Sequence, residues 1–286
     1  MRQDILVSIH RWSRGIAPRL GPLGGIARLV FRGLLRLRYP SGTLVTAEQN
    51  GRAWRMSPDV ALRGALQEFE TISWFRAVAR PGMTAIDVGA NVGQMSLELA
   101  TLVGPKGKVI AIEPAPGNLD LLRQHVRANG LEARVQVVEA ACADTHGGEV
   151  EFHVFGESAA SIGSGHSLIG AETLHQGDTE ISVHSIRCAR ISIDGLCEEY
   201  DALPSLIKID VEGGELQVLR GAMQTLARAR PVLRIGFHPF AFSNPVQASD
   251  ELRRIIASSG YHLEDAPSVG ALELAEYVAV PIVDPD

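Results

Sequence analysis

The stretch that decides the fold is Ala85-Ile86-Asp87-Val88-Gly89-Ala90-Asn91-Val92-Gly93. A short apolar run ends in the acid Asp87, and a turn with glycines at 89 and 93 then leads into residues with helical spacing. Glycine lets the backbone come close to a ligand, and the start of a helix offers unpaired N–H groups. A dinucleotide-binding turn would carry G-x-G-x-x-G and hold a pyrophosphate. The acid before the first glycine instead predicts a ligand with a cationic head and no phosphate.

Apolar runs of the same kind recur along the chain and alternate with helical stretches. Such alternation with short connections predicts parallel strands joined by right-handed crossovers. The fold class is therefore α/β: a doubly wound, mostly parallel, seven-stranded Rossmann-like sheet with helices on both faces, whose ligands sit at the carboxyl ends of the strands. The strand-like runs cover 84–88, 109–112, 135–138, 206–209, 232–235, 261–263 and 277–283, and the helical stretches cover 92–102, 119–129, 216–229 and 249–259.

Two of these strand ends carry residues suited to a nucleoside. Glu113 follows the second run, where a carboxylate can accept hydrogen bonds from both ribose hydroxyls. Asp87 and Glu113 stand at equivalent strand ends, so a ligand explains them better than two solvated loops. Ala141 follows the third run and predicts a flat wall for an adenine ring, although small residues at a strand end are also ordinary core material. The two acids fit NAD as well, so they indicate a nucleoside without choosing which.

The fourth and fifth runs end in the most polar segments of the chain. Residues 206–215 read Leu-Ile-Lys-Ile-Asp-Val-Glu-Gly-Gly-Glu, and we expect Asp210 to point into the cleft with Glu212 beside it. Glu215 falls in the first turn of the next helix, where an acid also favours the helix dipole. His238 follows the fifth run as a general base, as a metal ligand with Asp210 and Glu212, or as a structural histidine. We take Asp210, Glu212 and His238 as candidate catalytic residues, and a divalent metal as the less favoured alternative.

The chain divides into an N-terminal extension, residues 1–80, and a main domain, residues 81–286. Within the extension, 43–56 predicts a hairpin with Asn50-Gly51 as its turn, and 62–78 predicts a helix. The main domain contains an insertion, 149–193, with two β-like runs that flank a Ser/Gly-rich stretch, 157–179. Loops of that length inside a compact domain are usually functional. We interpret the stretch as a lid or substrate loop, with surface decoration as the alternative.

Charge is unevenly distributed along the 286 residues, whose net charge is −6. Residues 1–38 carry eight arginines and one acid, hence +7, which leaves −13 for the remainder. The acidic body argues against a broad nucleic-acid interface. The basic segment fits peripheral contact with an anionic membrane surface, an organelle-targeting peptide or a helical cap on the domain. The sequence shows no apolar run long enough to span a bilayer and no evident signal peptide. Its three cysteines lack C-x-x-C spacing, so we expect reduced thiols. We therefore expect a cytoplasmic location, with the inner face of the membrane as a peripheral site.

Taken together, these segments resemble the FkbM family of class I S-adenosylmethionine-dependent methyltransferases. The resemblance runs from Phe69 to Pro239 and does not cover residues 1–60. The segments that carry it, in the family's order, are Asp87-Val-Gly-Ala-Asn91-Val-Gly93, Ala111-Ile-Glu113-Pro-Ala-Pro116, Ile191-Ser-Ile-Asp194-Gly-Leu196, Ile207-Lys-Ile-Asp-Val-Glu-Gly-Gly-Glu215, Val218-Leu-Arg-Gly221-Ala and Arg230-Pro231.

The resemblance implies methyl transfer from S-adenosylmethionine to a hydroxyl of a saccharide, a polyketide or another small or polymeric acceptor. It implies that Glu70 faces the methionine amine and that Asp210 is the cleft acid. The turn residues Asp87, Gly89, Asn91 and Gly93 and the ribose acid Glu113 would complete the cofactor site. One departure is clear, because Gly236 stands where the family commonly has a glutamate. A non-catalytic cofactor-binding module therefore stays an alternative, and a nicotinamide-dependent oxidoreductase is a weaker one, because the glycine turn lacks the dinucleotide pattern.

Overall fold

The computed structural model describes residues 38–40, 42–63, 69–156, 166–168, 182–266 and 275–282. The basic segment up to residue 37 and most of the Ser/Gly-rich stretch 157–179 lie outside the described residues. None of the described helices is long and apolar enough to cross a bilayer. The three cysteines are free thiols, two of them buried.

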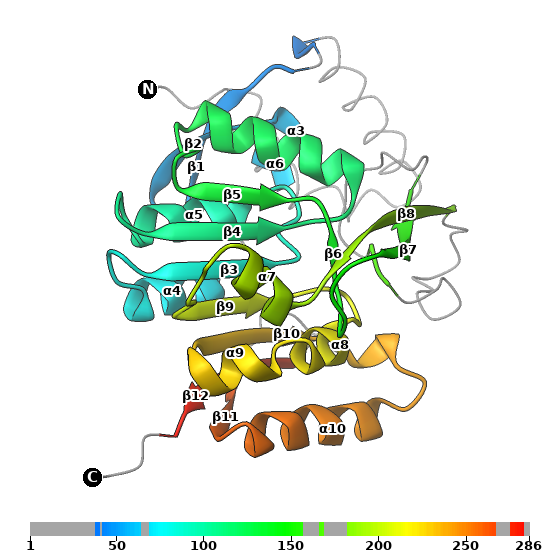
Figure 1. Cartoon of the computed structure of the whole chain (residues 1–286). Helices are drawn as coiled ribbons and strands as arrows, with labels where there is room; N and C mark the ends of the chain where they lie inside the picture. The colour runs from blue at the N-terminus through cyan, green and yellow to red at the C-terminus, as the bar shows by residue number, and fades with distance from the viewer. Residues whose placement is uncertain are drawn as a thin grey trace, which may run out of the picture.

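A seven-stranded sheet forms the centre of the protein, in the order β11-β12-β10-β9-β3-β4-β5 (Figure 1). Every neighbouring pair is parallel except those of β12, which runs antiparallel to β10 and to β11. The chain order reverses between β3 and β9, which is where ligands bind in sheets of this kind. This confirms the predicted fold class. The strands are β3 (Thr84–Val88), β4 (Lys108–Ile112), β5 (Val135–Val138), β9 (Leu206–Ile209), β10 (Val232–Phe237), β11 (Tyr261–Ala266) and β12 (Ala275–Pro281).

Helices cover both faces of the sheet because successive strand residues point in opposite directions. Ala85 packs into a core that contains Phe75 of α4 and Leu97 of α5. Its neighbour Ile86 packs into a second core, on the other face, with residues of α7 to α10. The helices are α4 (Phe69–Val78), α5 (Gln94–Leu102), α6 (Pro116–Ala128), α7 (Ile193–Glu199), α8 (Glu215–Arg220), α9 (Met223–Arg228) and α10 (Pro245–Ser258), with a 3-10 turn η4 (Pro239–Ala241).

The predicted N-terminal hairpin is confirmed. Strands β1 (Val45–Gln49) and β2 (Arg52–Met56) pair antiparallel around Asn50 and Gly51, whose φ values are 51° and 77°. Two consecutive positive φ angles make a type I′ turn, which matches the twist of a hairpin. The predicted helix 62–78 overlaps α3 (Pro58–Arg63) and coincides with α4 over 69–78, and residues 64–68 are not described. The hairpin shares the core of α4 and α5, so it packs as part of the main body.

The insertion 149–193 forms the expected hairpin, from β7 (Glu149–Phe155) and β8 (Val183–Ile191). A short strand, β6 (Ala141–Cys142), joins β8 in parallel and makes a three-stranded sheet. In Figure 1 this small sheet stands beyond the arrowheads of β4 and β5. The insertion is therefore placed at the carboxyl end of the strands, where the sequence predicts the ligand.

The stretch 216–229, predicted as one helix, is two helices that are separated at Gly221 and Ala222. A Cβ at Gly221 would lie 2.2 Å from the carbonyl oxygen of Ala143, so the chain passes too close to β6 for a larger residue. The sequence pattern does not predict helix α7, because Ser192 and Ile193 belong to the β-like run that ends the insertion at residue 193. Its N-terminus is capped by the Ser192 hydroxyl, which accepts a hydrogen bond from the N–H of Gly195.

Candidate active site

The carboxylate of Asp87 lies in the middle of the sheet and is fully buried. Its Oδ2 accepts a hydrogen bond of 2.5 Å from the hydroxyl of Ser96 on α5, and its Oδ1 lies 3.7 Å from Nζ of Lys208. Strand pairing sets Asp87 beside Lys208 in register, so both side chains leave the same face of the sheet. Asp87 therefore contacts Ser96 and Lys208 within the protein, and its expected contact with a cationic ligand stays a prediction.

The two glycines of the turn are required by close packing within the protein. Gly89 has φ 76°, and a Cβ there would lie 1.9 Å from the carbonyl oxygen of Asp210. Gly93 has φ 89°, and a Cβ there would lie 2.5 Å from Cδ1 of Leu122 on α6. The turn thus brings β3 against the end of β9 and seats α5 against α6. A role of these glycines in approaching a ligand stays a prediction.

Glu113 follows β4, and its carboxylate points inward, with 4% of the residue exposed. Oε2 accepts the N–H of Asn91 at 2.8 Å, while Oε1 accepts the N–H of Ala115 at 2.9 Å and the amide of Asn118 at 3.3 Å. A carboxylate has about four acceptor positions, so room is left for one hydroxyl rather than the expected two. Burial raises the pKa of Glu113 to about 7, against the effect of the hydrogen bonds from Ala115, Asn91 and Asn118.

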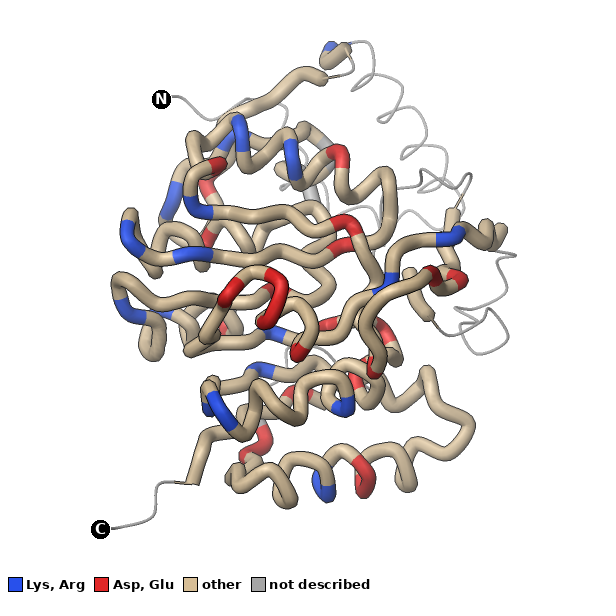
Figure 2. The backbone as a smooth tube through the Cα atoms, in the orientation of Figure 1, with Lys and Arg blue, Asp and Glu red and all other residues tan. Residues whose placement is uncertain are grey.

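Four polar side chains meet where β9 and β10 end. Nδ1 of His238 lies 2.7 Å from Oε1 of Glu215, and its Nε2 lies 3.3 Å from Oε2 of Glu212 and 3.6 Å from Oδ1 of Asp210. We call Asp210, Glu212, Glu215 and His238 the acid–histidine cluster. The structure brings together the three predicted catalytic residues. The sequence places Glu215 in the first turn of a helix, where an acid favours the helix dipole. In the structure Glu215 is fully buried, and its carboxylate contacts the imidazole of His238. Figure 2 shows acidic positions along these strand ends.

The protonation of this cluster follows from its charges. Burial opposes a charge on His238, but the hydrogen bond and charge of Glu215, followed by Glu212 and Asp210, outweigh it and raise the pKa of His238 to about 9. Burial acts in the opposite direction on Asp210, yet the charges of Lys208 and His238 keep the pKa of Asp210 below its ordinary value. Lys208 donates to Oδ2 of Asp210 at 3.1 Å. At neutral pH the histidine is therefore a cation and Asp210 is ionised, with 37% of its side chain exposed.

Glu70 lies in the first turn of α4 and fits the methionine amine of the cofactor that the resemblance implies. Its Oε2 is buried and has no hydrogen-bond partner among the described residues. A buried carboxylate oxygen without a partner is costly, and an ammonium group would satisfy it. Oδ1 of Asp87 is likewise buried without a hydrogen-bond partner among the described residues, so both carboxylates fit an ammonium group.

Ala141 and Gly236 both lie against other parts of the protein. Ala141, on β6, is 2% exposed and packs in a small core with Phe152 and Cys188, which fits the core alternative, and its contact with an adenine ring stays a prediction. A Cβ at Gly236 would lie 3.3 Å from Oδ1 of Asp210. Glu276 on the neighbouring strand β12 is paired with Gly236, so a carboxylate is present next to this position. Glu276 forms an ion pair with Arg234.

Two further findings limit the site. In the described part of the chain, no group of three or more His, Cys, Asp or Glu side chains is arranged to hold a metal ion.

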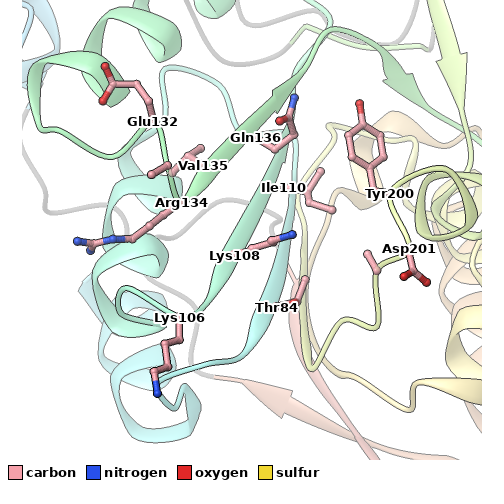
Figure 3. A pocket seen from close by; sticks show the side chains of 12 residues that line it. Thr84, Lys106, Lys108, Ile110, Glu132, Arg134, Val135, Gln136, Tyr200 and Asp201 are labelled. Atoms are coloured by element: carbon pink, nitrogen blue, oxygen red, sulfur yellow. The ribbon is translucent and has the colours of Figure 1, made fainter.

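The hollow in Figure 3 lies at the opposite edge of the sheet, where the strands begin, and is therefore separate from the acid–histidine cluster. Its lining includes Thr84, Lys106, Lys108, Arg134, Gln136, Tyr200 and Asp201.

Sequence reasoning missed Lys208 and Ser96 as partners of the site acids. The signal for Lys208 was present, since a lysine inside a buried strand needs a charged partner. Ser96 lies two residues into α5 and gives no comparable signal. Asp194, in one of the quoted segments, binds the N–H groups of Gln224 and Thr225, so it anchors α9.

Several known proteins are similar in sequence to this chain. Residues 87–263 match the methyltransferase FkbM domain. The chain is 32% identical over 142 residues to hexuronic acid methyltransferase AglP of Haloferax volcanii, which covers 49% of this chain and 50% of that protein. It is 32% identical over 110 residues to protein-L-isoaspartate O-methyltransferase of Methanopyrus kandleri, which covers 36% of this chain and 46% of that protein. The chain thus spans about half the length of these curated relatives.

Two solved structures are similar to part of the chain. A methyltransferase FkbM from Methylobacillus flagellatus has 18% identity and a TM-score of 0.48, covering 72% of this chain and 50% of that chain. A fibrillarin of Aeropyrum pernix with bound S-adenosylmethionine has 11% identity and a TM-score of 0.45, covering 83% and 82%. The domain match covers more than half of the present chain and includes Asp87, Glu113, Asp210 and His238. The chain therefore belongs to the family of methyltransferase FkbM domains, with the class I S-adenosylmethionine-dependent methyltransferase fold.

Proposed function

We propose that this protein is an S-adenosylmethionine-dependent O-methyltransferase that acts on a hydroxyl of a saccharide, a polyketide or a similar natural product. The observation that carries the proposal is the juxtaposition, at one sheet edge, of the cofactor turn around Asp87 and the acid–histidine cluster. The partial similarity to a hexuronic acid methyltransferase favours a saccharide among these acceptors. Residues at the turn would hold the cofactor, and those after β9 and β10 would handle the acceptor.

S-adenosylmethionine would supply a methyl group bound to a sulfonium, and an acceptor oxygen would bond to that methyl carbon in line as the methyl–sulfur bond breaks and S-adenosylhomocysteine leaves. Positioning therefore contributes most of the rate, and the acceptor hydroxyl must still lose a proton. We assign that proton to Asp210, because its carboxylate is ionised and partly exposed. Nε2 of His238, 3.6 Å away, is protonated at neutral pH and shielded. Glu212 and Glu215 would fix the imidazolium, whose charge holds Asp210 in its ionised form.

The first experiment is a calorimetric titration of the full chain with S-adenosylmethionine, S-adenosylhomocysteine and NAD in parallel. We expect micromolar binding of the first two and its loss in Glu70→Ala and Glu113→Ala. Asp87→Ala should also weaken binding, through the turn and Lys208. Binding of NAD alone, or of none of the three, would remove the proposal.

A turnover assay distinguishes the enzyme from the non-catalytic cofactor-binding module, which is the alternative that Gly236 raises. A panel of hydroxylated saccharides and polyketides with labelled cofactor should give slow transfer or cofactor hydrolysis. Binding without either outcome would favour the module. Chelation adds a second test, which addresses the less favoured metal alternative. Activity should survive EDTA, and its loss with recovery on Mg²⁺ or Mn²⁺ would favour the metal alternative.

Peripheral membrane contact through residues 1–38 is a further part of the proposal. It is supported by the net charge of +7 on that segment. Co-sedimentation with anionic liposomes should be stronger for the full chain than for a chain that starts at residue 39. Equal binding by both would refute the contact.

A further inference from the structure

A short segment of the loop between β7 and β8, His166 to Leu168, is fixed to β7. The backbone of Ser167 exchanges two hydrogen bonds with that of His153, at 2.8 and 3.0 Å. Nδ1 of His166 accepts the N–H of Phe155 at 3.1 Å. Ser167 is fully buried. These three residues therefore extend the small sheet by one short rung, and a polar side chain is held inside the protein.

The side chain of Ser167 contacts the turn that follows β9. Its Oγ donates a hydrogen bond of 2.7 Å to the carbonyl oxygen of Glu212, 45 residues away along the chain. Leu168 packs against the same turn, since a Cβ on Gly214 would lie 3.7 Å from its Cδ1. The segment thus touches the turn at Glu212 and again at Gly214.

This turn has a backbone conformation that needs support. Glu212 has φ 51° and Gly213 has φ 106°, so two consecutive residues lie in the left-handed region. For glutamate that region is unfavourable, by an energy of the same order as one hydrogen bond contributes. The bond from Ser167 to the Glu212 carbonyl is therefore large enough to decide which conformation the turn adopts.

The same turn orients the two acids on either side of the histidine. Oε2 of Glu212 lies 3.3 Å from Nε2 of His238. The N–H of Gly213 donates to Oε1 of Glu215 at 2.9 Å, and that oxygen lies 2.7 Å from Nδ1 of His238. A change of φ at Glu212 or Gly213 would alter both contacts at once.

We propose that Ser167 is a positioning residue, which holds the turn at Glu212 and Gly213 and so couples the segment from His166 to Leu168 to the acid–histidine cluster. This inference rests on the proposed function for its catalytic consequence, although the coupling itself is a property of the fold. Loss of this hydroxyl would change the turn, and with it the contacts of Glu212 and Glu215 with His238. The rate of transfer would then change, whereas cofactor binding would not.

The test compares Ser167→Ala with Ser185→Ala in the full chain. Ser185 is the control, because its hydroxyl lies on the same β7–β8 hairpin but contacts Nδ1 of His153, at 3.2 Å, instead of the carbonyl oxygen of Glu212. The first readout is the NMR titration of the His238 imidazole, assigned with a His238→Gln variant. The second is the separation of kcat from KM for the cofactor, and Ser167→Thr tests rescue by a retained hydroxyl.

We expect Ser167→Ala to lower the pKa of His238 and to reduce kcat by up to about 10²-fold, the loss that misplacement of a catalytic group by about 1 Å can cause. Cofactor KM and S-adenosylhomocysteine affinity should stay as in the wild type, and Ser167→Thr should restore the titration. A His238 titration equal to that of Ser185→Ala would overturn the inference. Failure of the wild type to bind S-adenosylhomocysteine would instead overturn the proposed function, since the titration needs no cofactor.

Discussion

Nδ1 of His238 lies 2.7 Å from Oε1 of Glu215, and neither residue is more than 5% exposed. The same carboxylate oxygen accepts a hydrogen bond from the N–H of Gly213. The backbone therefore sets the position of the Glu215 carboxylate, and this carboxylate in turn orients the imidazole of His238. A buried carboxylate on one ring nitrogen sets the orientation of the ring and favours its cationic form. The two residues are separated by 23 positions and by a strand, which is why the pair could not be read from spacing.

The first prediction concerns Glu215→Gln. Removing the charge should lower the pKa of His238 from its value of about 9. A histidine with a raised pKa stabilises the fold below its unfolded pKa of about 6.5, and that contribution is lost as pH rises through about 9. The wild type should therefore lose more unfolding free energy between pH 6 and pH 9.5 than the variant, by a difference on the order of 2 kcal/mol. Urea unfolding at both pH values measures it.

The control for this prediction is His262→Gln, which removes an exposed histidine on β11. It should leave the pH dependence of unfolding unchanged. A Glu215→Gln protein with the same pH dependence as the wild type would mean that Glu215 does not charge the histidine.

The second prediction concerns Glu113, whose pKa is raised by burial to about 7. Its ionised form is the better acceptor for a ribose hydroxyl, so S-adenosylhomocysteine should bind more tightly at pH 8 than at pH 6, by roughly tenfold. Glu113→Gln should bind more weakly at pH 8 and show little change with pH. Calorimetry at four pH values measures both proteins. A wild-type affinity that is flat across this range would show that Glu113 does not bind the cofactor in its ionised form.

Many strands and turns could be predicted from the sequence, because each of them depends mainly on residues that are close together along the chain. Thr84–Val88 was delimited correctly by its apolar residues, and the turn at Asn50-Gly51 by its tolerance of positive φ. The break at Gly221 depends instead on the close approach of Ala143, a contact that spacing does not encode. The site divides in the same way. Strand ends placed Asp210 and His238 on one rim, whereas the partners of Asp87 come from α5 and β9 through tertiary packing.

The third prediction tests Asp210 as the base through its neighbour Gly236. A Cβ at 236 would lie 3.3 Å from Oδ1 of Asp210, and no positive φ forbids a side chain there. Gly236→Glu should add a like charge beside Asp210 and raise its pKa, which moves the acidic limb of the kcat/KM profile upward by about one unit. The uncharged Gly236→Gln is the control, and it should leave the limb in place.

Asp210→Asn completes this test. It should reduce kcat by about 10²-fold or more, as loss of a general base does, while the affinity for S-adenosylhomocysteine changes little. If kcat instead rises with pH up to about 9 and Asp210→Asn keeps the wild-type rate, neutral His238 is the base.

The last prediction separates two reasons for glycine in the central turn. Gly89→Ala places a Cβ 1.9 Å from the Asp210 carbonyl oxygen, so β3 and the end of β9 must move apart. Gly130 has a similar φ of 64°, but a Cβ there would meet nothing within 4 Å, so Gly130→Ala carries only the conformational cost. We expect Gly130→Ala to lower the unfolding free energy by about 1 kcal/mol and Gly89→Ala by about 3 kcal/mol or more. Urea denaturation of the two variants measures the difference. Equal losses would mean that the turn has room for a side chain, and the glycine at 89 would then have to be explained by the cofactor alone.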